Sequence, residues 1–380
     1  MEWKLKDLTV DGKGSYGIGA PAVPYQEDKL TYLRITDIND DGSLNFSDLK
    51  SVDAEDAEKY ILKENDIVFA RTGNSTGRSY FYEKQHGTFV YAGFLIKFSL
   101  DPNKVNPRIL KYYTHSKPYF DWVNSFDTGA TRGNINAKTY GDMEIELPSR
   151  KVQDKIVSIL SSLDRKIELN NKINADLEEM AQAIFKNWFV DFEPFKDGKF
   201  VDSELGMIPE GWKVGTLEDL ITIKYGKDHK KLEDGTFPVY GSGGLMRFVN
   251  SWLYNGESVL IPRKGTLDNI MYVCEKFWTV DTMFFSVPKM DYVMKYVYNY
   301  IKRFDFSKMD EGTSVPSNTA ARLNKMQILI PTHEVLEMYD ETLCPIYNKR
   351  KMNDKESRTL STLRDTLLPR LMSGELEVPE

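Results

Sequence analysis

Two long stretches of the chain, residues 149–190 and 332–373, carry apolar side chains at alternating spacings of four and three. This spacing is typical of an α-helix that packs along another helix. Each stretch is longer than one globular domain can cover, so we expect the two helices to pair as an antiparallel coiled coil; docking of each helix on its own domain is the alternative. The predicted seam consists of Ile156, Leu160, Leu163, Ile167, Asn170, Leu177 and Ile184 in the first helix and Leu343, Ile346, Asn353, Leu360 and Leu367 in the second.

Both predicted seams become polar near the middle. Asn170 and Asn174 interrupt the first, and Arg350 and Asn353 interrupt the second. Polar residues in a coiled-coil core lower stability but fix the register and the partner. Pro345 is predicted to kink or interrupt the second helix, because proline lacks the N–H donor and clashes with the preceding turn.

Short runs rich in Val, Ile, Tyr and Phe fill the segments that precede the two helices, residues 1–148 and 212–331. Gly, Asn and Asp turns separate these runs, which predicts irregular β-rich domains with some helix, at 107–123 and 293–304. The fold class is therefore α+β, with two β-rich domains separated by two long helices. The remaining segments are a connector at 191–211, which has no period, and a C-terminal tail at 374–380.

The chain contains an internal repeat. The block "GATRGNINAKTYGDMEIELPS" begins at Gly129 and "GTSVPSNTAARLNKMQILIPT" at Gly312, and each ends an apolar stretch in a proline, Pro148 or Pro331. Two earlier blocks recur in the same order: "EWKLKDL" resembles "GWKVGTLEDL", and "NDIVFARTG" resembles "GESVLIPRKG". Three blocks in one order predict a duplicated unit with an approximate two-fold relation across the helix pair. An antiparallel helix pair would hold the two domains at a fixed separation, one near each end. Such an arrangement would suit a bipartite target, because half-sites one turn of DNA apart lie roughly 34–36 Å from each other and must be met at a fixed spacing.

The composition limits the classes of ligand that the chain is expected to bind. The net charge of −7 and pI of about 5.4 argue against an indiscriminately basic nucleic-acid binder, but not against DNA binding by local loops. The two cysteines and four histidines are scattered, so neither a disulfide framework nor a metal site is expected. With no apolar run of membrane-spanning length and no secretory signal, we expect a cytoplasmic protein.

The stretch "ARTGNSTGRSYF", residues 70–81, resembles a nucleotide-binding loop only superficially. Gly73 and Gly77 are one residue too close, Arg78 replaces the lysine, and a strand rather than a helix is predicted to follow. The equivalent loop of the second copy, "RKGTLDN", lacks the second glycine. No other motif indicates an active site, so we expect no catalysis by this chain.

Both copies share Arg-polar-Gly at the end of an apolar strand, which suits contacts with DNA phosphates and base edges. The alternative is a solvated hairpin whose arginine pairs with a surface carboxylate; recurrence in both copies favours DNA. A second loop, with Arg132 and Asn134, either touches DNA or only packs the domain against the coiled coil, and we favour packing. The candidate contacts of the strand-end loops are Arg71, Thr72, Gly73, Asn74, Ser75, Thr76 and Arg78 in the first copy and Arg263, Lys264, Gly265 and Thr266 in the second.

Three junction segments carry a family resemblance: "IFKNWFVDFEPF", "SELGMIPEGWKV" and "LRDTLLPRLMSGELEV". With the order domain, helix, domain, helix, the whole chain resembles the specificity subunits of type I restriction-modification enzymes. The resemblance implies that residues 1–148 and 212–331 are target-recognition domains, each reading one half of an interrupted DNA site, and that the paired helices set the gap.

The resemblance also implies the partners. Two methyltransferase (modification) subunits would dock on the helices and methylate adenine N6 with S-adenosylmethionine, and restriction subunits that use ATP and Mg²⁺ would join them; this chain itself would hold no cofactor. The rival readings are a nucleotide-binding enzyme that uses residues 73–79 and a coiled-coil scaffold that does not touch DNA. The bases recognised do not follow from the sequence, because irregular loops obey no residue-to-base code.

Overall fold

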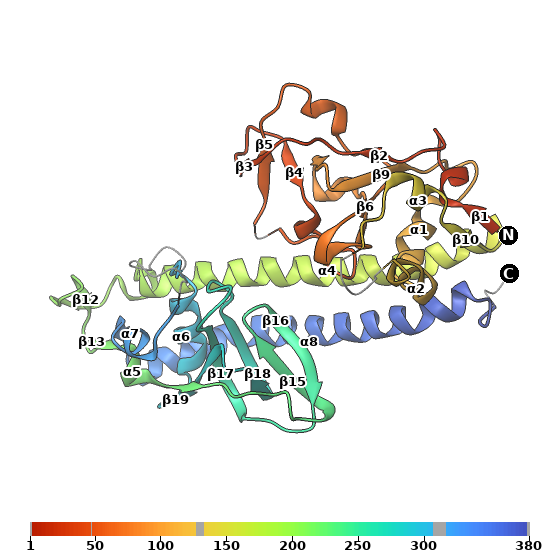
Figure 1. The fold of residues 1–380 in the computed structure, drawn as a ribbon. Helices are drawn as coiled ribbons and strands as arrows, with labels where there is room; N and C mark the ends of the chain where they lie inside the picture. Colours follow the sequence, from red (N-terminus) through yellow and green to blue (C-terminus); the bar gives the residue numbers. More distant parts are fainter. Residues whose placement is uncertain (1, 47, 127–132, 307–316, 378–380) are drawn as a thin grey trace. The chain divides into compact units, whose positions relative to one another are not determined.

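The computed structural model describes residues 2–46, 48–126, 133–306 and 317–377 (Figure 1). The chain divides into two compact units. The first unit comprises residues 1–169 and 356–380, and the second comprises residues 170–355. The units therefore do not follow chain order, because each contains half of both long helices.

The central strand of the first unit is β6, Asp66–Ala70, and all of its residues are buried. Ile67 and Phe69 contribute to the apolar cluster on one face of the sheet, and Val68 and Ala70 to the cluster on the other. Successive side chains of a strand point to opposite faces, so a strand covered on both faces reads as an unbroken apolar run. This explains why "DIVFA" shows no alternation of apolar and polar residues.

Two four-stranded sheets, ordered β2-β9-β6-β7 and β3-β5-β4-β8, and the pair β1-β10 form the described part of the first unit. Its short helices cover the β6 sheet through the cluster that contains Leu110, Tyr119 and Tyr140. The elements are β1 (Glu2–Lys4), β2 (Ser15–Tyr16), β3 (Ala22–Pro24), β4 (Thr31–Leu33), β5 (Lys50–Val52), β6, β7 (Ser79–Phe81), β8 (Phe89–Tyr91), β9 (Leu95–Ser99), α1 (Pro107–Tyr113), α2 (Lys117–Asn124), α3 (Ala137–Gly141) and β10 (Glu144–Glu146).

A six-stranded sheet, ordered β14-β19-β17-β18-β15-β16, dominates the described part of the second unit, beside the pairs β13-β20 and β11-β12. Its β17 corresponds to β6: Val259 and Ile261 join one apolar cluster, and Leu260 joins another. The elements are β11 (Phe200–Val201), β12 (Ile208–Pro209), β13 (Lys213–Thr216), α5 (Leu217–Leu220), β14 (Ile221–Tyr225), β15 (Asp234–Gly241), β16 (Gly244–Val249), β17 (Tyr254–Pro262), β18 (Met271–Thr279), β19 (Met283–Pro288), α6 (Val293–Ile301), α7 (Ala320–Asn324) and β20 (Gln327–Ile330).

The connector at 191–211 is more ordered than its sequence indicated. It forms the hairpin β11-β12, and Phe192, Phe195 and Ile208 pack on the core of the second unit. The aromatic side chains of this segment, rather than a period, hold it in place.

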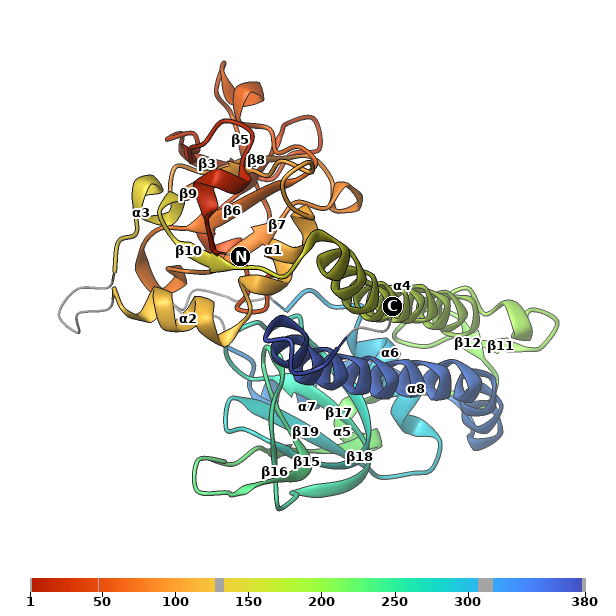
Figure 2. The same ribbon diagram turned by 90° about the vertical axis from the view of Figure 1, so that its right-hand side faces the viewer.

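The long helices are α4, Arg150–Phe189, and α8, His333–Met372, each of 40 residues. Two views show them side by side (Figures 1 and 2). In the first unit Asp164 of α4 pairs with Arg364 of α8 at 3.0 Å. In the second unit Asn174 donates to Asp354 at 2.7 Å, and the ring of Phe189 lies 4.8 Å from that of Tyr339. Partner numbers fall along α8 as they rise along α4, so the helices form the predicted antiparallel coiled coil.

The predicted seam is turned away from solvent. Toward its C-terminus, however, α4 buries Ala181, Phe185 and Phe189, a wider stripe than the seam alone. Phe185 packs on Tyr296 of α6 as well as on Tyr339 of α8, so this half of α4 contacts both the partner helix and the globular part of the second unit. The seam residues Ile156, Leu160, Asn170, Leu343 and Asn353 are buried, and Leu163, Ile167, Leu177, Ile184, Ile346, Leu360 and Leu367 are half-buried.

Helix α8 continues through Pro345 without interruption, so the predicted interruption is wrong. Pro345 is exposed, whereas Leu343 and Tyr347 on either side are buried against the core. A proline on the solvent side leaves the carbonyl of the preceding turn open to water, and the packing of the opposite face holds the helix together.

Candidate nucleic-acid interface

The turns that follow β6 and β17 have the same backbone arrangement in both units. The amide of Arg71 donates to the carbonyl of Phe94 at 3.1 Å, and the amide of Arg263 donates to the carbonyl of Thr282 at 2.8 Å. In return, the arginine carbonyls accept from Ile135 and from Asn318, both at 3.0 Å. Ile135 and Asn318 occupy matching positions in the repeated blocks that begin at Gly129 and Gly312. The described part of each block therefore packs against the strand-end turn, whereas the packing that we expected was against the coiled coil.

Each arginine lies over a tyrosine at the end of an edge strand, β2 or β14, which is separated from the arginine's own strand by one intervening strand. The guanidinium carbon of Arg71 is 5.1 Å from the ring centroid of Tyr16, and that of Arg263 is 5.5 Å from the ring of Tyr225. The tyrosines are 43% and 53% exposed, so both pairs reach the surface. Such stacking holds the planar guanidinium in one orientation. Nη1 of Arg263 donates to the carbonyl of Asp281 at 3.3 Å and Nε of Arg71 is buried, so the other guanidinium nitrogens are the donors available to a carboxylate, phosphate or guanine.

Sequence reasoning missed these tyrosines. The available signal was the dipeptide Tyr-Gly, at Tyr16-Gly17 and at Tyr225-Gly226, but the same dipeptide also occurs at Tyr140-Gly141 and Tyr240-Gly241. A Cβ on Gly17 would lie 2.2 Å from the carbonyl oxygen of Tyr91, and one on Gly226 would lie 2.0 Å from that of Val280. Glycine is required at both positions because the tyrosine-bearing strand approaches the next turn too closely for any side chain.

Glycine is also required within both strand-end turns. Gly73 has a φ of 74° and Gly265 a φ of 86°, in the left-handed region that other residues rarely adopt. The recurring Arg-polar-Gly pattern is therefore a turn geometry as well as a set of possible contacts.

The other candidate DNA contacts of the first turn differ in whether their side chains are exposed. Asn74 is exposed, and Thr72 is half-buried. Ser75 is buried, and the hydroxyl of Thr76 donates to the carbonyls of Gly73 and Gly133. These last two side chains hold the loop in shape.

Arg78 is paired with a surface carboxylate. Its Nε lies 2.7 Å from Asp40, and its Nη1 donates to the carbonyl of Ile38 at 3.0 Å. This pairing is what the alternative, a solvated hairpin whose arginine pairs with a surface carboxylate, predicts for this residue. It also connects the turn to the loop that contains Asp40.

The second turn presents its polar residues to solvent. Lys264, Gly265 and Thr266 are exposed, as is Asn134 in the first unit. Arg132 lies outside the described residues.

Comparison with known proteins bears directly on this duplicated arrangement. The model of the type I restriction modification DNA specificity domain matches residues 15–179 and 209–352, which covers both copies. The chain belongs to this family.

Relatives agree with the assignment. The chain is 28% identical to the type I restriction enzyme MjaIX specificity subunit of Methanocaldococcus jannaschii, over 71% of this chain and 69% of the relative. It is 22% identical to the HindI specificity subunit of Haemophilus influenzae, over 84% and 88%. The crystal structure of a type I restriction-modification system S subunit from M. genitalium shares the fold, with a TM-score of 0.56 at 18% identity, over 100% of this chain and 96% of that one.

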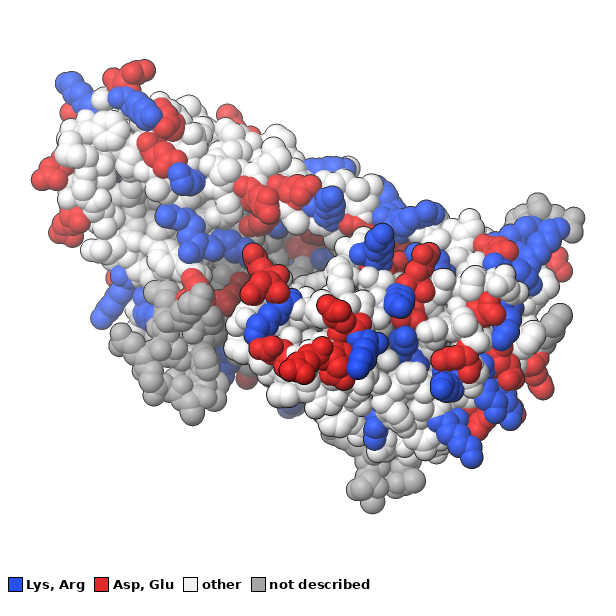
Figure 3. Space-filling model, turned by 90° about the horizontal axis from the view of Figure 1, so that it is seen from above, with Lys and Arg blue, Asp and Glu red and all other residues white. Residues whose placement is uncertain are grey.

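The surface of this specificity-family protein carries mixed charge. On the face shown in Figure 3, Lys and Arg side chains alternate with Asp and Glu rather than forming one basic sheet. This face therefore offers no continuous basic surface for DNA. Neither the long helices nor any other helix among the described residues combines the length and the apolar character of a membrane span.

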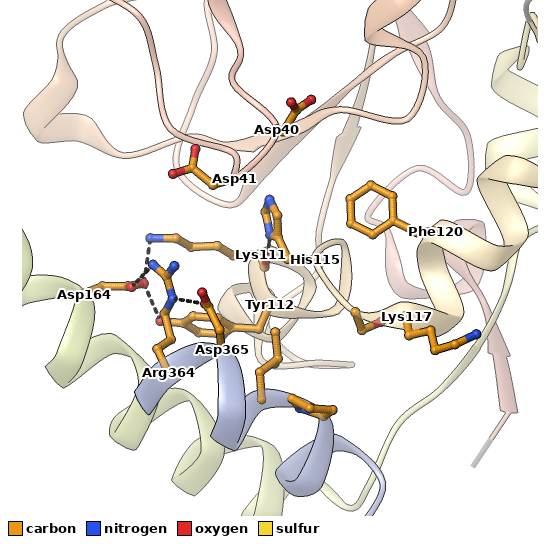
Figure 4. A pocket seen from close by; sticks show the side chains of 13 residues that line it. Asp40, Asp41, Lys111, Tyr112, His115, Lys117, Phe120, Asp164, Arg364 and Asp365 are labelled. Carbon is orange, nitrogen blue, oxygen red and sulfur yellow. Dashed lines mark hydrogen bonds and ion pairs between the residues drawn. The ribbon is translucent and has the colours of Figure 1, made fainter. Parts of the chain in front are cut away.

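A buried charged cluster joins α1 to both long helices in the first unit. Lys111, Tyr112 and Arg364 converge on Asp164, with distances of 3.2, 3.0 and 3.0 Å, beside a cavity of about 360 Å³ (Figure 4). Burial alone would raise the pKa of Asp164, but the two cations and the tyrosine hydroxyl together hold it below its usual value. A carboxylate with three partners suits a structural joint better than a catalytic base.

The second unit contains a similar joint built from other residues. Lys295 of α6 lies 2.7 Å from Asp340 of α8 and 3.1 Å from Glu257 of β17. Lys295 matches Lys111 in the repeats "ILKYY" and "VMKYV". In each unit, a lysine of the domain helix thus holds the domain to a long helix.

Proposed function

We propose that this chain is the sequence-specific DNA-binding subunit of a type I restriction-modification complex and that each unit reads one half of a bipartite site. The observation that carries the proposal is the pair formed by a half-buried arginine and an exposed tyrosine, present at the same strand end in both units. An arginine oriented by stacking suits bidentate binding of guanine O6 and N7, which is the commonest specific contact in the major groove.

The proposal includes partners that supply the chemistry. Two modification subunits with S-adenosylmethionine would methylate adenine N6, and restriction subunits with ATP and Mg²⁺ would complete the complex. The chain itself acts as a non-catalytic subunit. The names of its relatives, all specificity subunits, and the DNA specificity domain support this division of roles.

The geometry disfavours nucleotide binding by the first turn. Gly73–Ser75 form a single 3-10 turn, and the chain then enters strand β7, so the loop does not lead into the N-terminus of a helix as a phosphate-binding loop does. Thr76 and Arg78, the side chains that a phosphate would need, are engaged within the protein.

The test uses the chain assembled with its modification subunits. Arg71→Ala should weaken specific binding by roughly 5- to 150-fold and relax one half-site, and Arg263→Ala should do the same for the other half, as the loss of one bidentate contact implies. Arg247→Ala is the control, because Arg247 pairs with Asp234 at 3.0 Å within the β15-β16 hairpin and lies on neither a strand-end turn nor a long helix. Methylated adenines mapped genome-wide, together with duplex binding, supply the readout.

The scaffold reading makes the opposite prediction. If the double variant, Arg71→Ala with Arg263→Ala, kept both the affinity and the methylation pattern of the parent, DNA readout by these turns would be refuted. Cross-linking of radiolabelled ATP to the purified chain, abolished by changes in residues 73–79, would support the nucleotide-binding alternative instead.

A further inference from the structure

The first unit presents an exposed aromatic side chain beside its arginine–tyrosine pair. Phe94 is 58% exposed at the turn between β8 and β9, and its carbonyl accepts the hydrogen bond from the amide of Arg71. Single exposed apolar residues are common on proteins. The distinguishing feature here is its backbone bond to the residue proposed to contact DNA.

The equivalent turn in the second unit has the same geometry and a different side chain. The amide of Leu95 closes the first turn on Ala92 at 2.8 Å, and that of Met283 closes the second on Val280 at 3.0 Å. The position of Phe94 is taken by Thr282. Because the surrounding backbone is shared, the difference between the units here is one of side-chain chemistry.

An apolar cavity of about 620 Å³ adjoins Phe94. Its wall includes Ile18, Ala20, Ala22 and Ala92. Small aliphatic side chains of this kind leave room for an inserted group and offer it no hydrogen bond.

Two of the three polar side chains of the same wall, Arg34 and Tyr32, already have partners, and the third, Thr36, is exposed. Arg34 is bound by Asp37 at 2.6 Å and by Asp48 at 3.3 Å. The hydroxyl of Tyr32 donates to backbone carbonyls, the nearer of them that of Ile18 at 2.8 Å. The cavity therefore offers mainly apolar contact, since its cation is neutralised, its tyrosine hydroxyl is committed, and its one further hydroxyl, that of Thr36, is on an exposed side chain.

Only one base edge matches an apolar receptor. In the major groove, thymine alone among the four bases presents a methyl group. We infer that Phe94 and the adjoining cavity contact the 5-methyl group of a thymine in the half-site read by the first unit, and that Phe94 is a specificity-determining residue for that half. The inference rests on the proposed function, because it requires DNA to lie against Arg71.

The experiment replaces each thymine of both half-sites in turn by deoxyuridine, which removes only the methyl group. Duplex binding is measured with the assembled complex. One replacement, in the half that Arg71→Ala relaxes, should weaken binding by about 3- to 10-fold, the effect of one buried methyl group. Phe94→Ala should weaken binding to the unmodified duplex by a similar factor and should be insensitive to that same replacement. Phe94→Leu should retain part of the sensitivity, because it remains apolar.

The matched control is Phe46→Ala, since Phe46 is 50% exposed in the same unit and packs edge-on against His86. It should leave every thymine response unchanged. Any of three results would overturn the inference. The half-site relaxed by Arg71→Ala could contain no thymine, or Phe94→Ala could have no effect on binding. Phe94→Ala could also lose the same binding affinity on every duplex, with or without each thymine methyl group.

A 2-aminopurine probe separates methyl contact from insertion of Phe94 between base pairs. Fluorescence that rises on binding of the parent but not of Phe94→Ala would show unstacking by a wedge and would likewise overturn the methyl assignment. The two proposals fail separately. If Arg71→Ala loses specificity but Phe94→Ala binds every duplex as the parent does, only the thymine inference is refuted. If the double variant, Arg71→Ala with Arg263→Ala, also binds and methylates as the parent does, the proposed function is refuted as well.

Discussion

Removing the carboxylate of Asp164 is the sharpest test of the joint between α1 and the long helices. Asp164 is buried and has two cationic partners, Lys111 and Arg364, on different helices. Asp164→Ala leaves both cations in a partly dry site without their counter-charge. Breaking a buried ion pair from one side typically costs about 3–5 kcal/mol. For domains of 150–250 residues, each kcal/mol moves the melting temperature by about 2–4 °C, so we expect a decrease of roughly 6–20 °C.

Two further variants separate charge from shape. Asp365→Ala removes a carboxylate that also contacts Arg364, at 2.9 Å, but is 64% exposed, so the expected loss is below about 1 kcal/mol. Asp164→Asn keeps the side-chain volume and an acceptor for Tyr112 while removing the charge, and should fall between the other two.

The pH dependence supplies a second readout. The folded protein holds the pKa of Asp164 below its unfolded value of about 3.9. Its contribution to stability is therefore complete above that unfolded value and is lost as the pH falls toward the folded value. Thermal melting followed by near-ultraviolet circular dichroism between pH 7 and pH 3 should show this loss in the parent and not in Asp164→Asn. A melting temperature for Asp164→Ala within 2 °C of the parent would refute the joint.

The other predictions concern the close strand approach and the length of the helix pair. Gly17→Ala should lower the free energy of unfolding of the first unit, measured in urea, by more than about 2 kcal/mol, because the added Cβ would overlap a carbonyl oxygen. Gly19→Ala is the control, and should change this free energy by less than about 1 kcal/mol because its Cβ meets nothing within 4 Å. Equal effects of the two substitutions would contradict the reasoning. Deleting the opposed heptads 165–171 and 357–363 shortens each helix by about 10 Å. Methylation mapping should then show a shorter gap between the two half-sites. An unchanged gap would contradict a spacer role for the helix pair.

The parts of the fold that could be predicted are those with a local signal. The period of apolar residues located both long helices, and the polar middle of the seam appears as Asn174 bonded to Asn353 at 2.8 Å. The unbroken apolar run of β6 likewise marked a strand buried on both faces. In each case neighbouring residues along the chain carry the information, because they share one element.

The parts that could not be predicted depend on contacts between distant residues. Arg78 appeared available, but its partner Asp40 lies in another loop. The role of Tyr16 depends on an arginine that follows a different strand, and its only sequence signal was a two-residue repeat. The division of each long helix between two units was hidden for the same reason, since a seam shows that a face is buried and not which domain covers it.

The duplicated arrangement explains how one fold can recognise two different half-sites. The tyrosine, the glycine after it and the arginine of the strand-end turn recur in both units, and they fix backbone positions through close approach and hydrogen bonds that tolerate little change. The side chain at the adjoining turn, Phe94 or Thr282, is held by the same backbone bonds but does not contribute to them. Its chemistry can therefore change without disturbing the fold. Under the proposed function, the recurring residues place the turns against DNA, and the variable side chain between them selects the base.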